Sequence, residues 1–235
     1  MLDKENSNEL IEGIKDGVPI FLGYFTTSIA FGLLTRTSGL SFVQGLLISL
    51  TNFSGSGQFL MMNLYNAGVF LLEIAISVFF LNTRYIFMAS SLYSHLGNKK
   101  SIPGRLFVGF GTTDEIFTVA ALKGKSLSYW YFAGLILTSY LGWVGGTAFG
   151  FVSGSFLPEI LQQAAVITVY AMFACLLGKE VRSNLKALFV LIVSAGLNSI
   201  FILVMGLSTG ISFLISMLSA TMVGALIYTD EEAGV

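Results

Sequence analysis

The sequence predicts an all-α, polytopic integral membrane protein with seven or eight transmembrane or re-entrant helical segments. Hydrophobic residues make up 54% of the 235 residues and charged residues only 11%, whereas an ordinary soluble domain has about 25% charged residues. The apolar residues form long runs without the period-2 alternation of a membrane β-barrel strand. Because a spanning helix takes about 20 apolar residues, the chain has room for seven or eight segments.

Polar or glycine-containing joints divide the chain into eight apolar segments. Before them, residues 1–16 carry more acidic than basic side chains and are predicted to form an acidic N-terminal tail. A single transmembrane domain is expected over residues 17–228, followed by a short C-terminal tail at 229–235. The eight segments fall at residues 17–35, 41–62, 67–95, 105–122, 129–153, 159–178, 185–205 and 208–228.

The second and fourth segments are poor candidates for simple spanning helices. Residues 51–59 of the second read Thr-Asn-Phe-Ser-Gly-Ser-Gly-Gln-Phe, and these glycines and hydroxyls weaken a helix in its middle. We expect a broken or re-entrant helix there. The fourth segment is short and carries Thr-Thr-Asp-Glu at residues 112–115, so it must face protein or water rather than lipid.

The distribution of Lys and Arg gives an expected orientation, because cytoplasmic loops are enriched in both. Basic residues follow the third, fourth and sixth segments, whereas the joints near 63–66, 154–158 and 206–208 carry none. All the basic clusters share one side if the fourth segment enters and returns. The sequence then favours seven crossings, with the N-terminus outside and the C-terminus inside.

A weak internal repeat has an offset of about 86–90 residues. Residues 23–27 resemble 109–113, residues 53–59 resemble 143–149, and residues 86–89 resemble 172–175. An inverted repeat of three segments per copy is typical of secondary transporters. Chance similarity among apolar sequences is the alternative.

Composition and motifs exclude several classes of function. The formal net charge of -1 provides no basic excess for nucleic acid. One Cys and one His form neither an intrachain disulfide nor a zinc cluster. No nucleophile-elbow, Walker or zinc-protease motif occurs. We therefore expect no catalytic residues, no metal and no cofactor.

Charged residues within the apolar segments are the first candidates for function. Arg84, Asp114 and Glu115 lie inside segments, where an unpaired charge costs about 2.5–3.5 kcal/mol. We expect Arg84 to pair with one of the two carboxylates. Such a pair either takes part in proton coupling or only fixes helix register.

The run around residue 55 is the candidate binding loop. Glycines allow close backbone approach, side-chain oxygens form hydrogen bonds, and a helix break exposes N–H groups to an anionic carboxylate. Packing of small residues between helices is the alternative. The predicted substrate-binding residues here are Asn52, Phe53, Ser54, Gly55, Ser56, Gly57, Gln58 and Asn82.

A glycine stripe occupies the fifth segment, with Gly142, Gly146, Gly150 and Gly154 at intervals of four residues. Stacked small residues let another helix approach closely. We expect this stripe to pack helices, either within the chain or against a partner.

Four motifs, in order along the chain, resemble the AzlC-type branched-chain amino acid permeases, the large subunit of two-component exporters. They are Ala-Phe-Gly-Leu-Leu at 30–34, Phe-Ser-Gly-Ser-Gly-Gln-Phe at 53–59, Leu-Asn-Thr-Arg-Tyr at 81–85 and Thr-Asp-Glu at 113–115. The family often has Pro-Phe-Gly at the first motif and Asn-Leu-Arg-His at the third. An Asp-Phe pair typical of its sixth span is replaced near Val166, which puts the ion or amino acid preference in question.

The resemblance implies export of leucine, isoleucine, valine and methionine in a bacterial inner membrane, together with a small four-helix AzlD-type partner subunit. We expect the substrate side chain to contact Phe31, Phe53 or Phe59, and the Asp114→Asn variant to lose gradient-driven flux. A channel and a scaffold subunit for another small solute remain the alternatives. An intramembrane enzyme is disfavoured because Asp114 and Glu115 have no nucleophile or metal ligands beside them.

Overall fold

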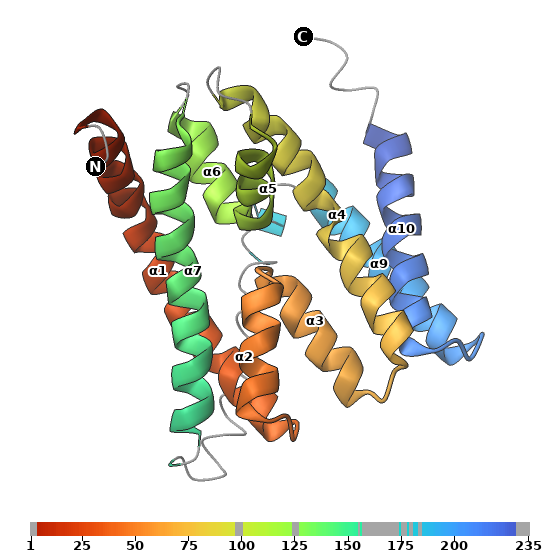
Figure 1. The fold of residues 1–235 in the computed structure, drawn as a ribbon. Helices are drawn as coiled ribbons and strands as arrows, with labels where there is room; N and C mark the ends of the chain where they lie inside the picture. Colours follow the sequence, from red (N-terminus) through yellow and green to blue (C-terminus); the bar gives the residue numbers. More distant parts are fainter. Residues whose placement is uncertain are drawn as a thin grey trace. The chain divides into compact units, whose positions relative to one another are not determined.

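The computed structural model describes residues 4–96, 101–123, 127–154, 156, 174, 178, 181–182 and 185–228. This part of the chain is helical (Figure 1), apart from turns and one isolated bridge between Leu96 and Leu127. The sixth predicted segment, 159–178, lies almost wholly outside the described residues. The helices are α1 (Lys4–Thr37), α2 (Phe42–Thr51), α3 (Gly55–Asn66), α4 (Leu71–His95), α5 (Ile102–Gly111), α6 (Asp114–Lys123), α7 (Tyr129–Ser153), α9 (Leu185–Leu203) and α10 (Thr209–Tyr228).

Four of these helices are long and apolar enough to cross a membrane. They are Asn6–Thr37, Leu71–Tyr93, Tyr129–Ser153 and Thr209–Leu226. The structure therefore supports a polytopic α-helical protein, and the total of seven or eight segments stays a prediction.

The described residues divide into two compact units. Unit 1 lies within residues 1–59 and 81–166, and unit 2 lies within residues 60–80 and 167–235. Helix α1 already begins at Lys4, within the predicted acidic tail.

Serine side chains set the starts of three helices in unit 1. Ser41 and Gln44 form a reciprocal capping box at α2, which satisfies two N–H groups at the helix end. Ser101 accepts a hydrogen bond from the Gly104 N–H at α5, and Ser128 accepts one from the Tyr131 N–H at α7. Each helix thus starts directly after a polar joint.

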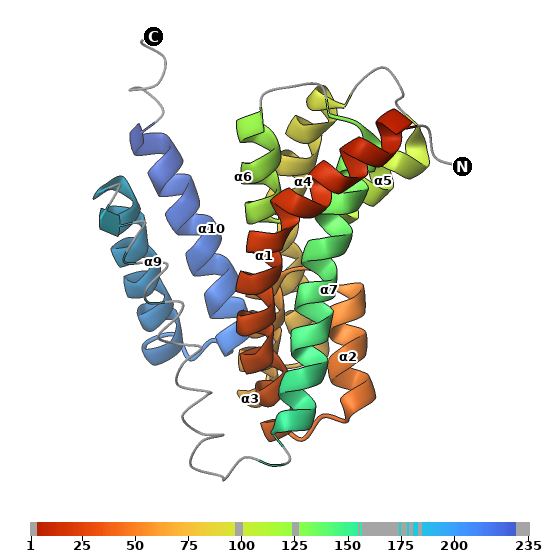
Figure 2. The same cartoon turned by 90° about the vertical axis from the view of Figure 1, so that its left-hand side faces the viewer.

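Helices α1 and α7 lie side by side and run in the same direction (Figures 1 and 2). The glycine stripe of α7 lies against α1: a Cβ on Gly142 would sit 2.7 Å from the Phe21 carbonyl oxygen. Gly146 and Gly150 meet backbone carbonyls of α1 in the same way, and Gly154 faces the side chain of Leu33. Only hydrogen atoms fit at the first three positions, so the stripe packs helices within the chain.

Helix α2 and the start of α3 form a helical hairpin whose tip is residues 52–54. The Ser49 hydroxyl donates to Gln58 Oε1 at 3.2 Å. In a continuous helix these two residues would lie about 13 Å apart along the axis. The chain therefore turns back at the break, and the second segment is re-entrant.

Helices α5 and α6 form a second hairpin whose tip is residues 112–113. Helix α5 runs parallel to α7: its start meets Tyr129, and Phe110 near its end meets the Tyr140 ring at 6.1 Å between centroids. Helix α6 runs opposite to α1, since Tyr24 bonds its start and Glu12 pairs with Lys123 at its end. The fourth segment thus enters and returns, and it does so from the end of unit 1 opposite to the first hairpin (Figure 1).

The expected orientation is wrong in one respect. Lys123 Nζ pairs with Glu12 at 2.7 Å and with Asp16, so the start of α1 lies at the same end of unit 1 as this basic residue. The seven-crossing arrangement put the N-terminus on the side opposite the basic joints. The cause is the second segment, which was counted as a crossing although it turns back.

The repeat offset of about 86–90 residues does not match the structure. Residues 53–59 span a helix break, whereas residues 143–149 lie in the uninterrupted helix α7. Residues 23–27 likewise lie within α1, although residues 109–113 reach a break. Residues 172–175 lie almost wholly outside the described residues. The elements that do resemble each other in inverted orientation are the two hairpins.

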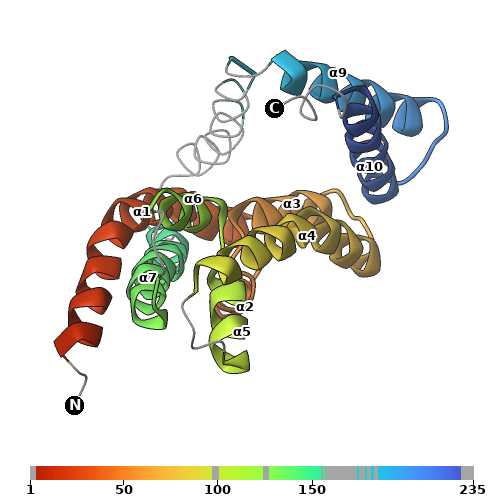
Figure 3. The same cartoon turned by 90° about the horizontal axis from the view of Figure 1, so that it is seen from above.

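In unit 2, α9 and α10 pack along each other (Figure 3), and a Cβ on Gly224 would sit 2.8 Å from Val190 Cγ2. Ser208 accepts a hydrogen bond from the Ile211 N–H at the start of α10. Its hydroxyl donates to Glu73 Oε2 at 2.6 Å. Glu73 therefore stabilises the N-terminal end of α10, where negative charge is favourable.

Candidate functional site

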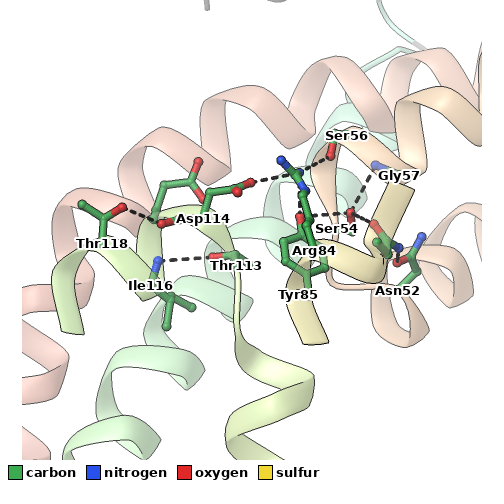
Figure 4. A network of polar contacts seen from close by, with 12 residues as sticks. Asn52, Ser54, Ser56, Gly57, Arg84, Tyr85, Thr113, Asp114, Ile116 and Thr118 are labelled. Carbon is green, nitrogen blue, oxygen red and sulfur yellow. Dashed lines mark hydrogen bonds and ion pairs between the residues drawn. The ribbon is translucent and has the colours of Figure 1, made fainter. Parts of the chain in front are cut away.

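The candidate site is built where the tips of the two hairpins meet, and all of its residues belong to unit 1 (Figure 4). Each tip breaks a helix near the middle of the unit. Because α2 and α6 each contain 10 residues, each is about 15 Å long, which is half the thickness of the roughly 30 Å hydrocarbon core. Each half-helix is therefore long enough to carry its tip from a membrane surface to the bilayer midplane.

At the first tip, Ser54 caps the start of α3. Its Oγ accepts a hydrogen bond from the Gly57 N–H at 3.2 Å, and its hydroxyl donates to Asn82 Oδ1 at 2.7 Å. Asn82 Nδ2 also lies 3.4 Å from Asn52 Oδ1, and the Tyr85 hydroxyl lies 3.2 Å from Ser54 Oγ. Helix α4 thus supplies two polar side chains, Asn82 and Tyr85, that form hydrogen bonds to Ser54 at this break.

Gln58 holds the first hairpin together from inside. It is fully buried, and its Oε1 accepts hydrogen bonds from Trp143 Nε1 at 3.1 Å and from the Ser49 hydroxyl. Its amide nitrogen donates to the Asn52 carbonyl oxygen, and Ser49 also bonds Thr147 on α7 at 2.8 Å. All these polar groups are paired, as buried polar groups must be.

At the second tip, Thr113 caps α6 as Ser54 caps α3. Thr113 Oγ1 accepts a hydrogen bond from the Ile116 N–H at 3.3 Å, and the Tyr24 hydroxyl donates to the same oxygen at 2.7 Å. Each capping hydroxyl therefore contacts a tyrosine from a neighbouring helix: Tyr85 at the first tip and Tyr24 at the second.

Arg84 joins the two tips. Its Nη2 lies 3.0 Å from Asp114 Oδ2, at the first residue of α6, and 2.8 Å from Ser56 Oγ, at the second residue of α3 (Figure 4). The same nitrogen lies 3.1 Å from the Tyr85 hydroxyl, and the guanidinium stacks over the Tyr85 ring. The side chains of Arg84 and Asp114 are 39% and 42% exposed, so the pair is open on one side.

Glu115 has a different environment from its neighbour Asp114. Its Oε2 accepts a hydrogen bond from the Tyr24 hydroxyl, and no ion pair joins it to a cation in the described part of the chain. Tyr24 is held by edge contacts with Phe53 and Trp143, at 5.8 and 5.4 Å between ring centroids. The two carboxylates at this tip are thus chemically distinct.

Two N-terminal helix ends therefore converge beside one arginine. The first N–H groups of a helix have no intrahelical partner, and the dipole there favours negative charge. Discontinuous helices whose N-terminal ends face a midplane site are the way many secondary transporters bind an anionic group. The arrangement can hold a carboxylate beside Arg84 and the N–H groups of the helix ends. It can hold an ammonium group beside Asp114 and Glu115.

The structure gathers most of the predicted site residues around these tips. Asn52, Ser54, Ser56, Gly57 and Asn82 share one hydrogen-bonded network with Arg84 and Asp114. A Cβ on Gly55 would sit 2.7 Å from the Trp143 ring. That glycine therefore makes room for the indole.

Three predicted aromatic contacts are buried in the structure. Phe31, Phe53 and Phe59 are 0%, 6% and 1% exposed, and Phe31 packs edge-on against Phe59. Phe53 is the one that lies at a tip, between the rings of Tyr24 and Tyr140.

Sequence reasoning missed Tyr24, Tyr85 and Trp143. A tyrosine or tryptophan in an apolar segment is ordinary at a membrane interface, and nothing in its immediate sequence distinguishes one that faces a helix break. Tyr85 had an indirect signal, since it follows Arg84 directly.

Comparison with known proteins gives the chain a family context. A family model described as "AzlC protein" matches residues 19–157, which include both hairpin tips and Arg84. No solved structure gives a significant match.

Curated relatives are membrane proteins from several organisms. An "Uncharacterized membrane protein" of Archaeoglobus fulgidus is 35% identical over 179 residues, which cover 73% of this chain and 78% of the relative. "Inner membrane protein YgaZ" of Escherichia coli is 30% identical over 65% of this chain and 64% of its own length. "Branched-chain amino acid transport protein AzlC" of Bacillus subtilis is 27% identical over 60% of this chain and 56% of its own length. The match thus spans less than two thirds of the last two relatives.

Proposed function

Since the chain belongs to the AzlC family of membrane transport proteins, we propose that it is a secondary transporter that exports branched-chain amino acids across a bacterial inner membrane. The observation that carries this proposal is the meeting of two hairpin tips at Arg84, which places two helix N-terminal ends beside a cation and two carboxylates. The name of the Bacillus subtilis relative, a branched-chain amino acid transport protein, supports the substrate class.

The substrate carboxylate binds at the first tip. There Arg84 and the unpaired N–H groups at the start of α3 offer donors, and Ser56 already bonds Arg84. The ammonium group binds beside Asp114 and Glu115, the acidic first residues of α6. A zwitterion thus places its negative group beside the cation at the first tip and its positive group beside the carboxylates at the second tip.

The apolar side chain of the substrate then reaches the aromatic residues behind the tips. Phe53 is the residue best placed for this contact, because it belongs to the first tip and packs against Tyr24. Phe31 and Phe59 lie deeper and act by supporting the tip. Leucine, isoleucine, valine and methionine all fit a contact that is apolar and without directional polar groups.

Release requires the two tips to separate. The substrate carboxylate competes with Asp114 for Arg84, so that substrate binding weakens the bond that joins the tips. Protonation of one carboxylate couples this cycle to the proton gradient. A small AzlD-type membrane subunit works with the chain as its partner.

Counterflow of radiolabelled leucine in proteoliposomes tests this proposal. The chain is reconstituted with and without a co-purified small partner, and unlabelled leucine, valine, methionine, lysine or glutamate is supplied on the opposite side. Saturable exchange stimulated by the first three but not by lysine or glutamate is expected. Exchange that does not saturate would indicate a channel, and no exchange from folded protein would contradict the proposed substrate class.

A further inference from the structure

Two adjacent carboxylates at the second tip have unequal surroundings, and from this we propose that Glu115 carries the coupling proton, with Tyr24 as its positioning residue. The inference rests on the proposed proton-coupled transport. The sequence left the coupling proton to one of the two carboxylates, Asp114 or Glu115, and the inference chooses Glu115.

Asp114 forms an ion pair with a cationic partner. Arg84 Nη2 lies 3.0 Å from Asp114 Oδ2, and a guanidinium in a protein keeps its charge and can only donate hydrogen bonds. Protonation of Asp114 would leave this cation without its counter-charge. Asp114 is therefore suited to holding the two tips together.

Glu115 is joined instead to a chain of two hydroxyls. The Tyr24 hydroxyl lies within hydrogen-bond distance of both Glu115 Oε2 and Thr113 Oγ1. Tyrosine has a single hydroxyl proton, and each hydroxyl both donates and accepts, so Tyr24 donates to one of the two at a time.

Both protonation states of Glu115 fit these atomic positions. When Glu115 is charged, the Tyr24 hydroxyl donates to the carboxylate. When Glu115 is protonated, the carboxyl donates to Tyr24 and Tyr24 donates to Thr113 Oγ1. The Tyr24 hydroxyl thus has a hydrogen-bond partner in either state of Glu115, with no movement of heavy atoms.

The described helices at this tip supply defined neighbours. Helix α1 gives Tyr24, which bonds Glu115, and α7 gives the Trp143 indole against Tyr24. Helix α6 gives the adjacent Asp114, which pairs with Arg84 of α4 beside Tyr85. Arg84 is the one cation beside two carboxylates in the described residues of the tips. One negative charge is therefore left over when no substrate is bound.

A proton or a substrate ammonium group balances that charge. Glu115 is exposed, so water that enters from one side of the membrane can deliver a proton to it. The proton leaves to water on the other side, and no further reactant is needed. A proton and a cationic ammonium group then compete for the same carboxylate, which links substrate movement to proton movement.

The test compares two transport measurements on the full chain in proteoliposomes. Leucine flux driven by an imposed proton gradient is divided by leucine counterflow without a gradient, for Glu115→Gln, Asp114→Asn and Tyr24→Phe. Glu12→Gln is the matched control, because Glu12 pairs with Lys123 at the far end of α6 and Lys123 keeps Asp16. We expect Glu115→Gln to reduce the ratio to one, whereas Asp114→Asn and Glu12→Gln keep it above one.

Tyr24→Phe removes a donor to the charged carboxylate, which favours the protonated form. We therefore expect the pH dependence of gradient-driven flux to move toward higher pH in this variant. A purely structural role of Tyr24 would lower both fluxes and leave the pH dependence in place. An unshifted pH profile would overturn the positioning role.

Infrared spectra supply a readout that needs no substrate. In nanodiscs, the carboxyl band that appears on acidification is expected in the native protein and in Asp114→Asn, and its Glu115 component is expected to be absent from Glu115→Gln. A band lost only in Asp114→Asn, or a gradient response kept by Glu115→Gln, would overturn the inference. Failure of leucine exchange in the native protein would instead count against the proposed function, because the spectra still report on Glu115.

Discussion

Arg84 on α4 reaches Asp114 at the first residue of α6, with 3.0 Å between Nη2 and Oδ2, and the same nitrogen donates to Ser56 on α3. One side chain thus connects the N-terminal ends of two helices that come from opposite hairpins. The connection is partly exposed, which lets a ligand compete for it.

Removing one member of this pair is expected to cost more than removing both. Arg84→Gln leaves the Asp114 charge without its partner, whereas Arg84→Gln with Asp114→Asn removes both charges. Because both side chains are about 40% exposed, we expect a loss of only about 1 kcal/mol for Arg84→Gln, and a smaller loss for the double variant. Thermal unfolding of the detergent-purified protein measures both losses. A double variant that loses as much stability as Arg84→Gln, or more, would contradict this coupling.

The α1–α7 contact is expected to be sensitive to a single methyl group. A Cβ at Gly142 would meet the Phe21 carbonyl oxygen at 2.7 Å, whereas one at Gly145 would lie 3.9 Å from the Phe25 ring. Overpacking of this kind costs about 1–3 kcal/mol. Unfolding measurements should therefore show Gly142→Ala destabilised and the control Gly145→Ala unchanged; equal stability of the two variants would speak against the parallel packing.

Gln58 is expected to act with Trp143 as one unit. Gln58→Met keeps the volume but leaves the Trp143 N–H and the Ser49 hydroxyl without their shared acceptor, at a cost of about 1–3 kcal/mol. Adding Trp143→Phe removes the stranded N–H donor, while Ser49 keeps its bond to Thr147. In a double-mutant cycle of unfolding free energies, the double variant should lose less than the sum of the single variants. Simple additivity would show that the hydrogen bond contributes nothing.

The re-entrant first hairpin gives a topology that labelling can check. Ser38 follows the end of α1, and Ser101 precedes α5 beside Tyr129 at the start of α7. Since α1 and α7 run parallel, these two positions lie at opposite ends of unit 1. In a Cys175→Ser background, a membrane-impermeant maleimide added to intact cells should label Ser38→Cys and reach Ser101→Cys only after permeabilisation.

Labelling of Ser38→Cys and Ser101→Cys from the same side would contradict the re-entrant second segment and would support the seven-crossing arrangement. Glu9→Cys serves as the second marker, because the start of α1 lies at the same end as Lys123. It should behave like Ser101→Cys.

The sequence predicted the helical membrane class and located both breaks, because glycines, hydroxyls and carboxylates stand out in an apolar chain. It also limited the partners of Arg84 to Asp114 and Glu115, since unpaired charges are costly in lipid. For the second segment, the sequence left a broken spanning helix and a re-entrant helix as alternatives and did not choose between them. Its 22 residues suffice to cross a bilayer, and only the contact between Ser49 and Gln58 shows that the chain turns back.

The division of labour between Asp114 and Glu115 likewise depends on tertiary structure. Adjacent residues at the start of a helix point in different directions, so one reaches Arg84 and the other reaches Tyr24. Tyr24 lies about 90 residues away along the chain, and no local pattern marks it.

The most direct test of substrate binding at the meeting point of the tips is competition for leucine exchange by leucine and by leucinol, which lacks the carboxylate. In the native protein, leucine should compete about tenfold or more better than leucinol, because a hydrogen bond to a charged group contributes about 1.5–3 kcal/mol. The Arg84→Gln/Asp114→Asn variant should bind both weakly and with similar affinity. Unchanged preference for leucine in that variant would place the carboxylate site elsewhere.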